Sequence, residues 1–294
     1  MIIVTGGNGF IGKNLVSSLE AIGKEVHIVD YIGEVSWDPD AFLDKVKNDN
    51  GFAKNIEVVY HQGASSDTTC YDPFYVMRVN LNYSINLLGL CLQNDIRLIY
   101  ASSSSVYGDG PFNEISFCEP KNLYAKSKYF FDEYYKCFEK HTTNQVVGLR
   151  YFNVYGPHEE RKGNISSVAY QFFKQIKSHN KIKIFENSEK YMRDFISVED
   201  VIKVNHHFLN NKDISGVYNC GTSKPRSFYD IAKILNKAYD FEIEEIPMPQ
   251  NLVGRYQKYT RSDNTLIRQK ANYHEDFLSL EEGIEKYLEY LEQG

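Results

Sequence analysis

Short apolar runs alternate with amphipathic helical patterns over the first half of the chain. Five runs of three to five residues lie at 2–4, 26–29, 56–60, 98–101 and 146–149. Between them, apolar positions recur at helical spacing at 13–22, 73–92 and 124–139. Strands without polar alternation, separated by helices, are typical of a parallel sheet covered on both faces. The pattern therefore predicts an α/β fold with a doubly wound parallel sheet.

The alternation loosens after about residue 157. Helices are expected at 166–176, 198–209, 227–239 and 280–291, and strands at 181–185 and 217–220. The strand at 217–220 is expected to return to the main sheet. We therefore expect a first domain over residues 1–160 and a smaller C-terminal α/β lobe over 161–294, with 196–222 returning to the first domain.

One interval is short for this fold. About 26 residues separate Asp30 from the strand at 56–60, and they are typical of a polar loop with one helix at 39–47. A doubly wound sheet usually has another strand in this interval. That strand is therefore either absent or part of a segment missing from the chain.

A glycine-rich turn, Gly7-x-Gly9-x-x-Gly12, lies between the first strand and the first helix. Glycines at this spacing allow a tight turn, close approach to a pyrophosphate and close helix–strand packing. Free N–H groups at the helix start can bind the phosphates. Asp30, at the end of the second strand, can accept hydrogen bonds from the adenosine ribose. These features predict a Rossmann domain that binds a nicotinamide dinucleotide.

Composition argues against several classes of protein. The net charge of −6 gives no basic footprint for nucleic acid or an anionic membrane. No apolar run approaches the roughly 20 residues that cross a bilayer, and the apolar start has no basic leader. The five cysteines show no CxxC spacing, which favours buried, reduced thiols over disulfides or a zinc site. We expect a cytoplasmic protein without a metal.

Tyr124 and Lys128 form a YxxxK motif at the start of a predicted helix, after the serine run 102–105. Positions i and i+4 share a helix face, so Lys128 lies beside Tyr124. A neighbouring ammonium lowers the pKa of a phenol, which is otherwise about 10. A serine at the end of the adjacent strand can hold the substrate oxygen. An acid/base site is predicted; a packing tyrosine and a solvated lysine are the alternative.

With these motifs the chain resembles the extended short-chain dehydrogenase/reductase family. The matching segments are TGGNGFIG at 5–12, HQGA at 61–64, SSSSVYG at 102–108, YAKSK at 124–128 and RYFNVYGP at 150–157, with Asp30 and Asn80. The resemblance implies that Ser103 is the catalytic serine, with Ser102 and Ser104 as near alternatives. The expected cofactor-binding residues are Gly6, Gly9, Phe10, Ile11, Gly12, Asp30, Tyr31, Gln62, Gly63, Ala64, Ser65, Asn80, Tyr124, Lys128 and Val154.

The C-terminal half resembles the ADP-glyceromanno-heptose 6-epimerases, a group within that family that makes a lipopolysaccharide precursor. The segments are RKGNISSVA at 161–169, FENSEKYMRDF at 185–195 and GRYQKYTRSD at 254–263. The resemblance implies inversion of C6″ of ADP-D-glycero-D-manno-heptose by transient oxidation with bound NAD(P). It also implies that Lys162 is a second acid/base and that the chain forms a homo-oligomer, often a pentamer.

Candidate substrate contacts follow from residue chemistry and from this resemblance. Arg193 and Arg255 have guanidinium groups suited to the ADP diphosphate, although Arg193 could instead pair with Asp194 or Asp200. Asn164 and Gln171 replace the serine and histidine that the group has near Lys162. The remaining candidates are Ser103, Asn153, Phe185, Glu186, Asn187, Ser188 and Tyr256.

The sequence leaves alternatives open for both the cofactor and the reaction. The resemblance implies NADP, but the group's basic residues after Asp30 are missing, and the carboxylate itself suits NAD because it would repel a 2′-phosphate. A nucleotide-sugar 4-epimerase or dehydratase of the same fold is an alternative, although Ser104 and Ser105 do not provide a dehydratase's acidic pair. A third is an inactive NAD(P)-binding regulatory protein, against which Tyr124 and Lys128 argue.

Overall fold

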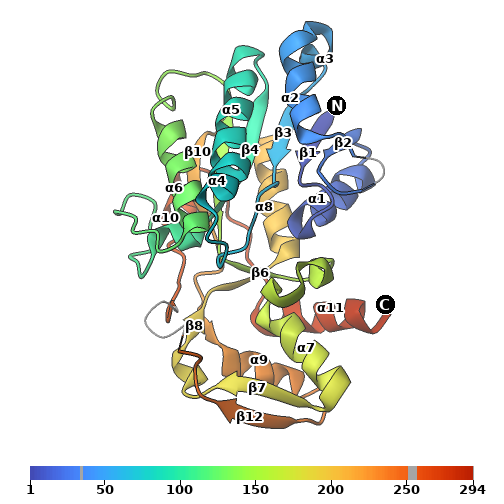
Figure 1. Ribbon diagram of the computed structural model, residues 1–294, viewed down its shortest axis with the longest axis vertical. Coiled ribbons are helices and arrows are strands. Elements are labelled where there is room, and N and C mark those ends of the chain that lie inside the picture. The colour runs from blue at the N-terminus through green and yellow to red at the C-terminus, as the bar shows by residue number, and fades with distance from the viewer. Residues whose placement is uncertain (34–35, 251–256, 294) are drawn as a thin grey trace.

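The computed structural model describes residues 1–33, 36–250 and 257–293 (Figure 1). Its larger part is a six-stranded sheet with helices on both faces, and a smaller lobe lies at one end of it. In Figure 1 the N-terminus lies in the larger part, whereas the C-terminal helix lies against the lobe.

The central sheet is entirely parallel. Its strands are β1 (Ile2–Thr5), β2 (Val26–Val29), β3 (Val58–His61), β4 (Arg97–Ser103), β5 (Val146–Tyr151) and β10 (Gly216–Cys220). They lie in the order β10-β5-β4-β3-β1-β2. The predicted return of the chain to the sheet at 217–220 is confirmed. The carboxyl ends of all six strands meet at one edge, where ligands bind in folds of this type.

Two layers of helices cover the sheet. One face carries α1 (Phe10–Ala21), α8 (Val198–Asn210) and α10 (Thr265–Gln269). The other carries α2 (Pro39–Asn48), α3 (Asn50–Lys54), α5 (Tyr83–Gln93) and α6 (Leu123–Lys136). Successive strand residues point to opposite faces, so Ile2 packs with Leu15 whereas Ile3 packs with Phe42. The predicted doubly wound sheet is confirmed.

Some predicted helix boundaries were wrong. Helix α1 begins at Phe10, three residues before the predicted start, because the glycine turn leads directly into the helix at its N-cap, Gly9. The helix predicted at 73–92 is three consecutive segments: α4 (Pro73–Val76), the π-helix η1 (Met77–Asn82) and α5. A π-helix has a different hydrogen-bond step, which apolar spacing alone does not reveal.

The smaller lobe has its own core. The parallel strands β7 (Lys181–Phe185) and β12 (Glu242–Ile246) pack with α7 (Val168–His179), α9 (Phe228–Leu235) and α11 (Leu280–Gln293). Two short strand pairs complete the fold: β6 (Asn153–Tyr155) with β9 (Phe195–Ser197), and β8 (Met192–Arg193) with β11 (Arg226–Ser227). Strand β12 was not predicted, since its sequence is mostly acidic. The domain division at residue 160 stays a prediction.

The short interval after Asp30 contains no strand in its described residues, 31–33 and 36–57. A single bridge between Val29 and Trp37 takes its place at the edge of the sheet. The Trp37 N–H donates to the Ile28 carbonyl at 2.9 Å, and the Trp37 carbonyl accepts from the Asp30 N–H at 2.9 Å. Where a further strand usually pairs with the edge of the sheet, Trp37 alone makes the backbone hydrogen bonds to β2 and Asp30.

The described part of the chain contains no helix of the length and apolar character that crossing a membrane requires. All five cysteines are free thiols; Cys91, Cys118 and Cys220 are buried, Cys70 is half-buried and Cys137 is exposed, so the prediction of buried thiols was wrong for the last two.

Candidate active site

The glycine turn between β1 and α1 is built on backbone contacts that leave no room for side chains. Gly6 has a φ of +67°, and a Cβ there would lie 2.5 Å from the Cα of Gly63. A Cβ on Gly12 would overlap the carbonyl oxygen of Gly6. Glycine is therefore needed at both positions, and the turn packs directly against the loop that follows β3.

The N-terminus of α1 is open to a ligand. Its N-cap, Gly9, makes no side-chain hydrogen bond to the first turn. The first N–H groups of a helix have no partner within the helix, and they carry a partial positive charge. This turn therefore fits the pyrophosphate of a dinucleotide, which can approach the backbone closely and accept hydrogen bonds from it.

A first pocket lies beside the carboxyl ends of the strands β1, β2 and β3. The Oδ2 atom of Asp30 accepts a hydrogen bond from the Asn8 N–H at 3.0 Å. Predicted cofactor residues that line this pocket are Gly6, Gly9, Asp30, Tyr31, Gln62, Gly63, Ala64 and Ser65. Apolar and aromatic residues that were not predicted also line it: Val29, Pro39, Tyr75, Val79 and Tyr83. A carboxylate beside an apolar wall suits the ribose and base of an adenosine.

Asn80 is buried rather than part of the wall of this pocket. Its Oδ1 accepts a hydrogen bond from the Ser65 N–H at 2.8 Å, and its Nδ2 donates to the Ser65 carbonyl at 3.0 Å. Nδ2 also donates to the hydroxyl of Ser127 on α6 at 3.1 Å. Asn80 thus joins the loop after β3 to α6, and its predicted part in binding the cofactor stays a prediction.

A second pocket extends from the glycine turn to the start of α6. It shares Gly6, Gly9, Ile32, Gln62 and Ala64 with the first pocket. The further predicted residues that line it are Phe10, Ile11, Gly12, Ser103, Tyr124, Lys128, Val154 and Lys162. The candidate catalytic residues therefore come from three separate parts of the chain and face one cavity together with the glycine turn.

Tyr124 and Ser103 are in contact in this cavity. Burial raises the pKa of Tyr124, and its hydrogen bond with Ser103 acts to lower it. The Ser103 hydroxyl also lies 2.9 Å from the Ser105 hydroxyl and accepts from the Ser105 N–H at 3.2 Å. Ser102 instead donates to Asp132 at 2.9 Å. These contacts favour Ser103 over Ser102 as the hydroxyl of the site.

Lys128 is a buried cation at the base of the cavity. It is 4% exposed, and its Nζ donates to the Ala101 carbonyl at 2.8 Å. Burial lowers the pKa of Lys128 to about 8, while the negative charge of Asp132 acts to raise it. His61 is neutral at physiological pH, because burial lowers its pKa to about 3. Lys128 is thus placed to stabilise a phenolate at Tyr124 or to bind a ribose hydroxyl.

Lys162 lines the second pocket close to the glycine turn. It lies on a short 3-10 segment, η3 (Glu159–Ile165). Its Nζ is 5.4 Å from the centroid of the Phe10 ring, which belongs to the first residue of α1. Burial lowers the pKa of Lys162, and the negative charge of Glu159 acts to raise it. A lysine in this position can exchange a proton more readily near neutral pH than an exposed one.

Buried hydrogen bonds fix the segment that carries Lys162. Glu159 is 0% exposed and accepts hydrogen bonds from the Gly156 N–H at 3.3 Å and the Ser167 N–H at 2.6 Å. Gln171 donates to the Gly163 carbonyl at 2.8 Å. Gln171, predicted to contact substrate, therefore braces η3 from α7 in this structure.

Several predicted substrate residues do not line either pocket. Within the described residues these are Asn153, Gln171, Phe185, Glu186, Asn187, Ser188 and Arg193. Asn153 is exposed on β6, and Ser188 is buried beyond the end of β7. Arg255 and Tyr256 lie outside the described residues, as does the side chain of Asn164. Their part in substrate binding stays a prediction.

Arg193 is buried in the lobe, 5% exposed, with its guanidinium 5.8 Å from the centroid of the Phe228 ring. Asp194 accepts hydrogen bonds from backbone N–H groups of the loops after β10 and before α10. Asp200 pairs with Lys203 at 3.1 Å. Both acids that were considered as structural partners of Arg193 thus have other well-formed contacts.

Sequence reasoning missed part of the second pocket. Arg161 and Ile165, on either side of Lys162, line it, as do Tyr151 and Phe152 at the end of β5. Arg161 could have been found as a basic neighbour of a proposed acid/base. The aromatic pair carries no such chemical signal, because a tyrosine next to a phenylalanine is equally typical of a core.

A model of the NAD dependent epimerase/dehydratase family matches residues 2–221. The chain belongs to this family. The matched range runs from β1 to the end of β10 and so includes the whole central sheet, the glycine turn, Tyr124 and Lys128. Membership agrees with the predicted nicotinamide dinucleotide as cofactor and with the short-chain dehydrogenase/reductase resemblance.

Individual relatives extend the match over the full chain. A Brachyspira hyodysenteriae protein named ADP-L-glycero-D-manno-heptose-6-epimerase is 44% identical, with 100% of this chain and 98% of the relative covered. The Helicobacter pylori ADP-L-glycero-D-manno-heptose-6-epimerase structure has a TM-score of 0.82 at 31% identity, over 99% of this chain and 96% of its own. The Thermus thermophilus UDP-glucose 4-epimerase complex with NAD has a TM-score of 0.81 at 25% identity, over 99% and 98%.

Replacing Gly12 by Ala should remove most of the affinity for both NAD and NADP, because the new Cβ would overlap the Gly6 carbonyl and displace the start of α1. Isothermal titration calorimetry measures this. Gly89→Ala is the matched control, since a Cβ there meets no atom within 4 Å on α5. The control should bind normally and gain about 0.5–1 kcal/mol of unfolding free energy. Normal binding by Gly12→Ala would contradict the assignment of the turn.

Proposed function

We propose that this protein is a nucleotide-sugar epimerase that inverts C6″ of ADP-D-glycero-D-manno-heptose to give the L-glycero epimer. The observation that carries the proposal is the second pocket, which Tyr124, Lys128 and Lys162 line together with the glycine turn. Relatives with this activity in their names cover the whole chain. The homo-oligomer that the resemblance implies and the cytoplasmic location expected from the composition belong to the same proposal.

The chemistry of the substrate explains why such a site needs a redox cofactor. C6″ is not adjacent to a carbonyl and has no acidic proton, so inversion requires oxidation of its hydroxyl and reduction from the opposite face. The glycine turn and Asp30 would hold a nicotinamide dinucleotide, which would supply the hydride acceptor and donor for these two half-reactions. C6″ lies outside the sugar ring, so rotation about the C5″–C6″ bond can present either face. The C6″ oxygen then needs a proton-transfer group in each of two orientations.

Tyr124 serves one orientation in this proposal. Its phenolate oxygen takes the hydroxyl proton at C6″ as the carbon is oxidised, and the hydroxyl of Ser103 donates a hydrogen bond to the same substrate oxygen. The ammonium of Lys128 stabilises the phenolate, which offsets the effect of burial on the pKa of Tyr124. The positive charge of an oxidised nicotinamide acts in the same direction.

Lys162 serves the other orientation. Burial favours its neutral form, whereas Glu159 favours its ammonium, so both forms are accessible for proton exchange. After rotation, the ammonium of Lys162 gives a proton to the C6″ oxygen as the carbon is reduced. The proton that Tyr124 takes and the proton that Lys162 gives leave the protonation of the substrate unchanged, and the return of the hydride restores its oxidation state. Transfer of a proton from Tyr124 to Lys162 through solvent then restores both groups for the next turnover.

The first pocket favours NAD over NADP as the cofactor in our proposal. The Asp30 carboxylate lines that pocket and would repel a 2′-phosphate. No lysine, arginine or histidine occurs between residues 31 and 44. The next basic residue, Lys45, has its Nζ 5.1 Å from the centroid of the Trp37 ring and 4.7 Å from that of Phe52. These positions support a ribose with a free 2′-hydroxyl beside Asp30.

The purified protein should convert ADP-D-glycero-β-D-manno-heptose to its L-glycero epimer, as followed by NMR of C6″. Tyr124→Phe should slow this inversion by about 10²–10⁴-fold, the usual contribution of one acid/base group. Tyr129→Phe, on the same helix but outside the cavity, should keep the parent rate. Turnover of a UDP-hexose in place of the heptose would reject the proposal in favour of a 4-epimerase.

Lys162→Met should also suppress inversion by at least about 100-fold, while the dissociation constant for NAD stays unchanged. Lys174→Met is the matched control, because Lys174 likewise lies over an aromatic ring, that of Tyr170 at 5.6 Å, but away from the cavity. A parent rate in Lys162→Met would exclude the second acid/base and leave the role of Tyr124 standing.

Calorimetry should give a lower dissociation constant for NAD than for NADP. Asp30→Asn should bring the two dissociation constants closer together, because the amide removes the charge that repels a 2′-phosphate while keeping an oxygen acceptor. Asp44→Asn, on α2 and outside the first pocket, should leave the ratio of the two constants unchanged. Tighter binding of NADP by the parent protein would overturn this preference.

A further inference from the structure

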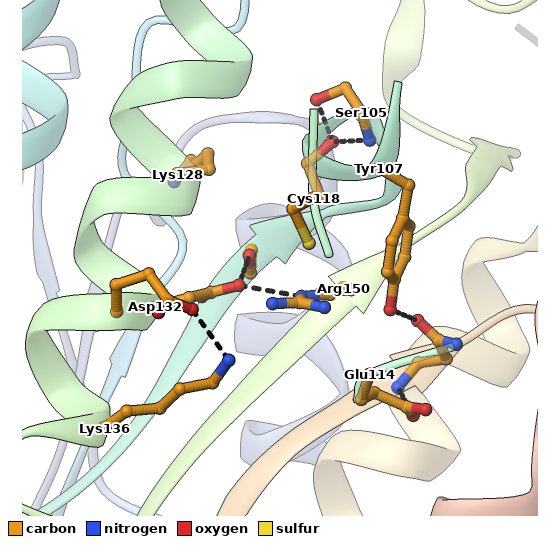
Figure 2. Close-up of polar contacts among 12 residues, drawn as sticks. Ser105, Tyr107, Glu114, Cys118, Lys128, Asp132, Lys136 and Arg150 are labelled. Atoms are coloured by element: carbon orange, nitrogen blue, oxygen red, sulfur yellow. Dashed lines mark hydrogen bonds and ion pairs between the residues drawn. The ribbon is translucent and has the colours of Figure 1, made fainter. Parts of the chain in front are cut away.

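The carboxylate of Asp132 lies one helical turn beyond Lys128 on α6 and is fully buried, 0% exposed. It accepts hydrogen bonds from the Tyr100 hydroxyl at 3.0 Å, the Ser102 hydroxyl at 2.9 Å and Nε of Arg150 at 2.8 Å. Figure 2 shows this carboxylate facing the guanidinium of Arg150, with Lys128 on the preceding turn of the same helix. Three hydrogen bonds to a buried carboxylate hold the side chain of Asp132 rigidly, because hydrogen bonds to a charge are strong in the protein interior.

Two of the residues that donate hydrogen bonds to Asp132 lie near the carboxyl end of β4, next to Ser103. Tyr100 and Ser102 flank Ala101, whose carbonyl accepts the hydrogen bond from Lys128. Ser102 also directly precedes Ser103. Asp132 therefore joins α6, which carries Tyr124 and Lys128, to the strand that carries the catalytic serine. The spacing between these groups depends on this junction.

Arg150 makes the junction electrically neutral. The side chains of both Arg150 and Asp132 are 0% exposed, and Nε of Arg150 lies 2.8 Å from Oδ2 of Asp132. The guanidinium also lies 4.9 Å from the centroid of the Tyr107 ring. Ser102 and Arg150 are direct neighbours in the β4–β5 register, so the pair extends the junction to a second strand. Removing one member alone would leave a buried charge without its partner, which is strongly destabilising.

The charge of Asp132 also acts on Lys128. Burial disfavours the ammonium form of Lys128, and Asp132 favours it. From β3, His61 faces Lys128 but is neutral, since its pKa is lowered to about 3. From β4, Lys128 receives only the carbonyl dipole of Ala101, and Tyr124 is uncharged until it gives up its proton. Arg150 contacts the carboxylate of Asp132 directly, with 2.8 Å between Nε and Oδ2.

We propose that Asp132 is a positioning residue that, neutralised by Arg150, holds Lys128 in its ammonium form and fixes α6 against the end of β4. It acts through Lys128 rather than on the substrate. The inference rests on the acid/base roles proposed above for Tyr124 and Lys128. Its consequence is a defined pH range: the site keeps its cation, and with it the stabilised phenolate, up to the pH at which Lys128 loses its proton.

The test uses the double variant Asp132→Asn/Arg150→Gln, which removes both charges but keeps hydrogen-bonding groups at both positions. A second double variant, Glu57→Gln/Arg97→Gln, is the matched control. It removes an ion pair of 2.8 Å at the opposite end of the same strand, where Arg97 begins β4. Thermal unfolding of each protein reports the loss of stability that both variants share.

The first readout is the pH titration of the Lys128 ¹³Cε resonance, assigned by its absence in Lys128→Met. Its midpoint should fall to lower pH in the Asp132/Arg150 variant, because Asp132 is the charged group that favours the ammonium form of Lys128 and the amide that replaces it carries no charge. The midpoint should stay unchanged in the control. An unchanged midpoint in the Asp132/Arg150 variant, or an equal fall in both, overturns the proposal.

The second readout is the pH dependence of kcat for the epimerisation. In the Asp132/Arg150 variant the alkaline limb should move to lower pH by the same interval as the NMR midpoint. A purely structural role would instead lower kcat by one factor at every pH, and that result also overturns the proposal. If the parent protein shows no epimerisation, the proposed function fails, while the NMR titration still decides the role of Asp132.

Discussion

The contact between the backbones of Gly6 and Gly12 constrains the rest of the site. Because a side chain on Gly12 would overlap the Gly6 carbonyl, α1 can begin directly against the end of β1. A Cβ on Gly6 would meet Gly63 in the same way, so the loop after β3 packs onto the turn. This arrangement directs the first N–H groups of α1 across the carboxyl edge of the sheet. Both pockets are lined by Gly6 and Gly9 of this turn.

Two lysines in the second pocket show how similar side chains acquire different tasks. Burial favours the neutral form of both Lys128 and Lys162, and in each case a buried carboxylate acts against it. Lys128 donates to a strand carbonyl in the rigid sheet domain. Lys162 lies on a short 3-10 segment over the ring of Phe10. The first surroundings suit a cation that supports Tyr124 near neutral pH, whereas the second suit a group that exchanges a proton with substrate.

Local signals predicted much of the fold and several of the residues that line the two pockets. The run at 26–29 matches β2, and the YxxxK motif places Tyr124 and Lys128 on one face of α6, because both depend on residues adjacent in sequence or one helical turn apart. The pair of Asp132 with Arg150 could not be predicted, since it requires a strand and a helix to pack in a particular register. The π-helix at 77–82 and the single bridge at Trp37 also depend on tertiary packing. Arg193 is a comparable case, because burial in the lobe is invisible in its local sequence.

Lys162, the second acid/base of the proposed function, is tied to the glycine turn by contacts of α1. Asn14 of α1 donates to the Phe10 carbonyl at 2.9 Å and to the Pro157 carbonyl at 2.8 Å, just before the segment that carries Lys162. The ammonium of Lys162 then lies over the ring of Phe10 itself. A dinucleotide that orders the start of α1 would therefore also order the position of Lys162. An epimerase needs this coupling, because the oxidised sugar must be reduced before it leaves, and both proton-transfer groups must be in place while the hydride is held.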